Sequence, residues 1–80
     1  MTPERLRECL VILRWHNATL AEALGCDEHL ILAWVAGYED IPAKVGAWLE
    51  ALTLVHAETE KLKPTTVKGR KLKGVLGKKA

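Results

Sequence analysis

The stretch NATLAEALGCDEHLILAWVAG, residues 17–37, determines the fold that this sequence predicts. Its first part reads as a short helix, with Asn17 as the expected N-cap and Leu20 and Leu24 recurring at helical spacing. Gly25 then supplies a residue that readily adopts left-handed backbone angles, which is typical of the turn after a helix.

The second part of this stretch predicts another short helix. Asp27 is the expected N-cap, and Leu30, Ile31 and Trp34 fall on one side of the helix before Gly37 ends it. Helices of this length are not stable alone in water, so both must pack against other parts of the chain.

The order of these residues resembles the Cro and lambda-repressor-like family of helix-turn-helix DNA-binding domains. The resemblance covers residues 3 to 56, and the residues that carry it are Leu20, Ala21, Leu24, Gly25, Ile31, Trp34, Gly37, Ile41-Pro42 and Trp48-Leu49. It implies a compact all-α bundle of four to five helices, which inserts the helix from Glu28 to Ala36 into the major groove of DNA, usually as a homodimer.

The helix before this stretch is expected to begin with Thr2 as its N-cap and Pro3 at its first position. Val11 and Ile12 lie off its core side and are candidates for a partner surface, and Trp15 is expected to fill the gap between this helix and the next. The core side is expected to hold four residues at helical spacing, namely Leu6, Cys9, Leu10 and Leu13.

A long last helix is expected to begin with Pro42 as its first residue. Its core side is expected to consist of Val45, Trp48, Leu49, Leu52 and Val55. A second apolar strip contains Ala47, Ala51 and Leu54, and small residues around one leucine allow another helix to approach closely. We expect this strip to form the dimer interface, and the alternative is that it packs on the chain's own tail.

Composition and length indicate one small domain without a membrane-spanning or secretory segment. The 80 residues contain no run of about 18 apolar residues and no basic-plus-apolar leader. Cys9 and Cys26 form no CxxC motif and are expected to be reduced thiols. We therefore expect a cytoplasmic protein, which DNA binding would place on the nucleoid.

Charge divides the chain at residue 60. Residues 1–60 contain four basic and ten acidic side chains, a net charge of −6, whereas residues 61–80 contain eight basic side chains and no acid. We expect a helix-turn-helix domain over 1–60 and a basic, mostly disordered arm over 61–80. The arm residues expected on DNA are Lys68, Arg70, Lys71 and Lys73, and the alternative is a solubilising tail without a partner.

The outer face of the helix from Glu28 to Ala36 is expected to carry His29, Leu32 and Ala36, flanked by Glu28 and Ala33. This face has no Arg, Lys, Asn or Gln, the side chains that usually contact guanine or adenine. Two interpretations remain. In the first, His29 contacts a base or phosphate, Leu32 and Ala33 meet thymine methyl groups, and Glu28 accepts from cytosine. In the second, the face belongs to a protein interface.

Four further residues are DNA contacts only because the resemblance implies it. Asn17 and Thr19 would lie near a phosphate at the start of the first motif helix, and Tyr38 and Lys44 would reach the same strand. Capping alone would also explain Asn17 and Thr19. Lys44 would then be a solvated charge and Tyr38 a cover for the edge of the core.

Metal, cofactor and enzyme chemistry are not expected. Cys26 and His29 are closely spaced, but no second ligand pair accompanies them, and no catalytic triad or phosphate-binding loop is present in the sequence. We therefore expect a homodimeric DNA-binding transcriptional regulator without a small-molecule effector, and a repressor since the sequence offers no second sensing domain. The alternative is a protein-interaction module, antitoxin-like or an adaptor, built on the helix-turn-helix frame.

Overall fold

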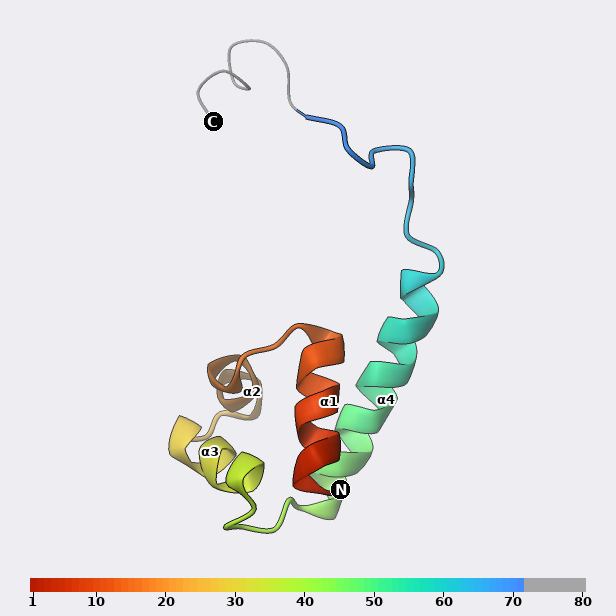
Figure 1. The fold of residues 1–80 in the computed structure, drawn as a ribbon. Helices are drawn as coiled ribbons and strands as arrows, with labels where there is room; N and C mark the ends of the chain where they lie inside the picture. The colour runs from red at the N-terminus through yellow and green to blue at the C-terminus, as the bar shows by residue number, and fades with distance from the viewer. Residues whose placement is uncertain (72–80) are drawn as a thin grey trace.

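The computed structural model of the chain describes residues 1–71 and is all-helical over that range, with no strand (Figure 1). Its four helices are α1 (Pro3–Leu13), α2 (Asn17–Leu24), α3 (Glu28–Ala36) and α4 (Ala43–Glu60). Helix α1 packs against α4 on one side and against α3 on the other, and α2 packs against α3. The predicted all-α class is confirmed.

The first three helices all end in the same way. Arg14, Gly25 and Gly37 have left-handed backbone angles, with φ of 60°, 69° and 82°. In each case the next amide donates back into the helix that has just ended, over 2.9 Å from Trp15 to Leu10, 3.0 Å from Cys26 to Ala21 and 2.8 Å from Tyr38 to Ala33. These bonds satisfy carbonyls that the helix end leaves unpaired, and they reverse the chain within a few residues.

Every helix contributes to one core. The buried apolar side chains are Leu6, Cys9, Leu10, Leu20, Ala21, Ile31, Trp34 and Leu49. Leu13 and Leu24, also expected inside, are partly buried. Leu30 was expected inside as well, but 38% of it is exposed because it lies at the edge of the buried side of α3. Burial of these side chains is the main favourable term for a domain of this size.

The core side of α4 differs from the predicted one. Its buried residues are Gly46, Leu49 and Thr53, whereas Val55 is 59% exposed and Trp48 is also exposed. The expectation for Val55 was wrong because α4 carries apolar residues almost all the way round. Met1 lies close to Gly46, since a Cβ added at Gly46 would lie 3.1 Å from the Cβ of Met1, so a small residue suits this buried position of α4.

Two details of the helix ends differ from the predictions. His16 rather than Asn17 precedes α2 as its cap residue, and its amide donates to the Thr19 hydroxyl over 3.3 Å. Pro42 is likewise the cap of α4 and not its first residue. Trp15, expected between the first two helices, is partly buried against the core, and its ring centroid also lies 6.0 Å from that of Trp48 on α4.

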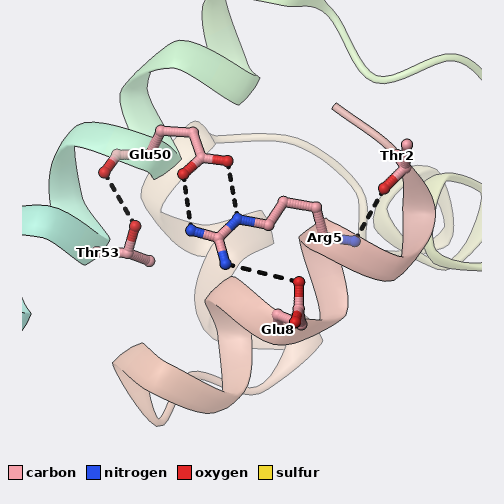
Figure 2. Close-up of polar contacts among 5 residues, drawn as sticks. All are labelled: Thr2, Arg5, Glu8, Glu50 and Thr53. Carbon is pink, nitrogen blue, oxygen red and sulfur yellow. Dashed lines mark hydrogen bonds and ion pairs between the residues drawn. The ribbon is translucent and has the colours of Figure 1, made fainter.

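A two-point ion pair fastens α1 to α4 (Figure 2). Arg5 donates from Nε and Nη2 to the two carboxylate oxygens of Glu50, each over 2.8 Å, and Glu8 lies 3.6 Å from Nη1. The hydrogen bonds from Arg5 hold the pKa of Glu50 below its usual range and raise that of the guanidinium. Beside this pair, the buried hydroxyl of Thr53 donates to the Glu50 carbonyl over 2.9 Å.

After α4 the chain makes two turns, and every side chain from Lys61 to Lys71 is exposed. Figure 1 shows this segment leading away from the helices. Within residues 1–71, none of the helices combines the length and the apolar character that crossing a membrane requires.

Candidate functional site

Helix α3 is anchored on one side and open on the other. Ile31 and Trp34 are buried against α1 and α2, whereas Leu32 is 43% exposed. The rest of this outer face consists of exposed Glu28, His29 and Ala36 and of half-buried Ala33. The structure thus buries Ile31 and Trp34 and exposes Glu28, His29 and Leu32 as the sequence predicts, whereas Leu30, expected inside, is also exposed.

Asp27 fixes the start of this face. One oxygen of its carboxylate accepts from the backbone amide of His29 over 2.7 Å and lies 2.8 Å from Nδ1 of the His29 ring. These two contacts, the backbone one first, lower the pKa of Asp27. Because the Nδ1 side of the ring is turned to the Asp27 carboxylate, Nε2 of the exposed ring remains available for a further hydrogen bond.

The residues that flank α3 in the sequence are acidic, and Arg7 of α1 reaches the helix from the side, where it donates to the Val35 carbonyl over 2.7 Å. The helix contains no Lys or Arg, Asp27 and Glu28 lie at its start, and Glu39 and Asp40 follow its end. The nearest following cation in the sequence is exposed Lys44, in the first turn of α4. This distribution favours groups that donate hydrogen bonds to the face over phosphates, which would be repelled.

The other expected contact residues lie on the segments that precede and follow α3. Asn17 and Thr19 are half-buried in the first turn of α2, where the Thr19 hydroxyl already accepts from His16. Tyr38 is 86% exposed and is tied to the end of α3 by its amide. Capping is therefore part of the role of Thr19, whereas Tyr38 does not cover the core.

The basic segment offers exposed cations at Lys68, Arg70 and Lys71, while Lys73 lies outside the described residues. The segment up to Lys71 leaves the apolar strip of α4 uncovered, since Ala47, Ala51 and Leu54 are all exposed. Leu54 is 65% exposed, so an aliphatic side chain stands in solvent on this helix.

A groove of about 500 Å³ between α1 and α4 joins the two surfaces that the sequence offered as partner sites. Ile12 from α1 and Leu54 from α4 both line it, together with Ala51 and Ala57, and the pair of Arg5 and Glu50 borders it. From the sequence, the two surfaces were considered separately. Only the packing of α1 on α4, which brings distant residues together, could reveal that they are continuous.

The described residues contain no cluster of three or more His, Cys, Asp or Glu side chains suited to a metal ion. Cys9 and Cys26 are free thiols, and burial raises the pKa of Cys9. The described residues thus combine an exposed face on α3, an exposed apolar strip on α4 and an exposed basic segment. Comparisons with protein-family models, curated proteins and solved structures found no match to this chain.

Proposed function

We propose that this protein is a sequence-specific DNA-binding regulator in which α2, the turn at Gly25 and α3 act as a helix-turn-helix. The observation that carries the proposal is the orientation of α3, whose inner side is buried through Ile31 and Trp34 while its outer face is open. A helix presented in this way fits the major groove of DNA, which is about 12 Å wide.

Contacts to base edges would come from three residues of this face. The Nε2 atom of His29 can accept from an adenine or cytosine amino group, and Glu28 can accept from cytosine. Leu32 can contact the methyl group of thymine. The face lacks the side chains for bidentate contacts, so a large share of the affinity must come from the DNA backbone.

Backbone contacts are proposed for the segments around α3 and for the basic segment. Asn17, Thr19, Tyr38 and Lys44 are placed there by the resemblance to Cro and lambda-repressor-like domains. The cations beyond α4 would offset the net charge of −6 on residues 1–60. Repression in the cytoplasm is the simplest outcome, since a protein on an operator excludes other proteins from it.

Dimerisation is proposed through the exposed strip of Ala47, Ala51 and Leu54. Two copies related by a two-fold axis would bury the strip against itself and present two copies of α3 to two half-sites.

A protein-interaction module is the second candidate. It is favoured by the acidic residues at both ends of α3 and by Leu32, an exposed aliphatic side chain on the outer face. In this function, which antitoxin-like and adaptor proteins perform, α3 would bind a basic protein surface instead of DNA.

Fluorescence anisotropy at low salt separates the two candidates. Labelled duplexes should cover the region upstream of the gene and a random sequence of equal length. We expect binding to both, and tighter binding to the upstream duplex because only that binding includes base contacts. Failure to bind any duplex at low salt would rule out the regulator and leave the interaction module.

A further inference from the structure

A second groove, of about 660 Å³, lies where α1 ends and α2 begins. Its polar lining consists of Arg7, Arg14, His16 and Asn17, and its apolar lining includes Trp15 and Val35. Among the described residues, none of those that line this groove is acidic. We propose that it binds the sugar–phosphate backbone of DNA beside the groove that α3 enters, an inference that rests on the proposed function.

The groove is where the available positive charge of the helical part collects. Residues 1–60 contain only four Lys or Arg side chains, and Arg5 is occupied by both oxygens of Glu50. Two of the other three, Arg7 and Arg14, line the groove. On a domain with a net charge of −6, an anion is therefore attracted to this groove more than to the surroundings of α3.

Both arginines keep unused hydrogen-bond donors. Arg7 donates from Nη1 to the Val35 carbonyl over 2.7 Å, and its Nη2 lies 3.8 Å from Glu4. Arg14 Nη2 lies 3.8 Å from Glu60. Distances of 3.8 Å are too long for hydrogen bonds, and exposed ion pairs of this kind are weak, so a phosphate can readily replace the carboxylates.

The backbone of Arg14 gives a second, independent indication. Its φ of 60° and ψ of 39° lie in the left-handed region, where glycine fits with the least strain and where the two following helices do end in glycine. An arginine at this position lowers stability relative to glycine but adds a guanidinium to the groove. Strain of this kind is common where a side chain serves binding.

The mixed lining matches the chemistry of a nucleic-acid strand. Along such a strand charged phosphates alternate with largely apolar sugars, so sugars can lie on Trp15 and Val35 while phosphates meet the arginines. Asn17 belongs both to this groove and to the proposed DNA contacts at the start of α2, so the same strand can run from one to the other.

The test compares Arg14→Gly with the unmodified chain and with Arg14→Lys, which keeps the positive charge and the non-glycine residue at this position. Affinity for the upstream and random duplexes is measured by anisotropy across a salt series, and the thermal midpoint is measured for each protein. Arg14→Gly should weaken both complexes about tenfold, the effect of losing one charge-assisted hydrogen bond. It should also reduce the slope of log affinity against log salt by about 0.9 and leave the midpoint unchanged or higher.

Arg14→Lys should leave the slope nearly unchanged, because the slope depends on the positive charge that lysine keeps. If the unmodified chain binds duplex but Arg14→Gly binds with the same affinity and slope, the groove is not a DNA site, whereas the proposed function stands. If the unmodified chain binds no duplex at all, the proposed function itself fails.

Nuclear magnetic resonance on the unmodified chain tests the groove without any substitution. Titration with duplex should shift the Trp15 indole and Asn17 amide signals together with those of His29. Signal shifts confined to α3 would overturn the inference. So would a result in which poly-glutamate, but not duplex, shifts the signals of the groove residues, because the groove would then bind an acidic protein.

Discussion

Arg5 and Glu50 face each other across α1 and α4, and two hydrogen bonds of 2.8 Å join them. This contact is important because α4 packs mainly against α1. The pair lies at the edge of the groove that holds Ile12 and Leu54, so it also fixes the surface proposed for dimerisation.

Replacing Glu50 with Gln should lower the free energy of unfolding at neutral pH, because the two-point ion pair is lost. The pKa of Glu50 is lowered in the folded state, so its contribution is present above the ordinary glutamate pKa and is lost as the pH falls through the lowered value. Urea unfolding of both proteins at pH 7 and at about pH 3 should therefore give a larger difference at pH 7 than at pH 3. Glu58→Gln is the control, since Glu58 contacts only Lys61, over 3.4 Å, in the described structure. Equal differences at both pH values would assign the effect to packing.

The rotation of α4 can be tested with two substitutions. Leu49→Ala should cost about 2–5 kcal/mol, since Leu49 is fully buried and its loss leaves a cavity. Val55→Ala should change stability by no more than about 0.5 kcal/mol, because Val55 is exposed. Chemical denaturation of the two variants measures both effects. A loss of stability from Val55→Ala well above about 0.5 kcal/mol would show that Val55 is buried, as the apolar pattern of α4 predicts.

The sequence was sufficient to predict the helix ends and the buried side of a helix where the apolar spacing and the helix-ending residues agree. Gly25 and Gly37 mark two helix ends, and Ile31 and Trp34 define the buried side of α3, so this part was predictable. Arg14 adopts the same backbone without being glycine, and nothing in its residue type signals it.

The prediction failed for α4 because its apolar residues do not select one side. Gly46 and Thr53 face α1 for reasons that depend on distant residues, namely Met1 beside Gly46 and the Arg5 pair beside Thr53. The groove lined by Arg7 and Arg14 was missed for the same reason. Arg7, Leu10, Val11 and Arg14 recur at helical spacing, but the groove also needs Asn17 from the start of α2 and Val35 from α3, which only the packing of the helices brings to this place.

Alanine at His29 or at Leu32 should reduce discrimination between the upstream and random duplexes by about 1–3 kcal/mol. Both side chains are exposed, so the melting temperature should hardly change. Anisotropy on the two duplexes and a thermal melt give the two measurements. A lower melting temperature with unchanged discrimination would show that these side chains stabilise the fold and do not contact bases.

Replacing Leu54 with Glu should convert a dimer to a monomer, since it places a charge in a close apolar contact. Leu62→Glu is the matched control, because Leu62 is also exposed but lies beyond the end of α4. Sedimentation measures the mass, and circular dichroism checks that the helices remain. If the mass of the Leu54 variant stays that of a dimer, Val11 and Ile12 on α1 are the next surface to test.

Truncation after Lys63 should weaken binding to upstream and random duplexes by similar factors. The removed segment contains six basic residues and no acid. If about three of them contact phosphates, the slope of log affinity against log salt should fall by nearly 3, because each contact contributes about 0.9. Anisotropy over a salt series measures this slope for the full chain and for the truncated chain. An unchanged slope would mean that the segment does not lie on DNA.

The contact between Trp15 and Trp48 gives this protein an internal optical signal. The centroids of the two rings lie 6.0 Å apart and their planes are inclined at 52°, although Trp15 precedes α2 and Trp48 lies within α4. They can therefore meet only after the chain between them has closed into a loop. Since Trp34 is buried in α3, its emission and the signal from the tryptophan pair report on different parts of the bundle. Stopped-flow refolding can thus compare the docking of α4 with the formation of the α2–α3 unit, without any added label.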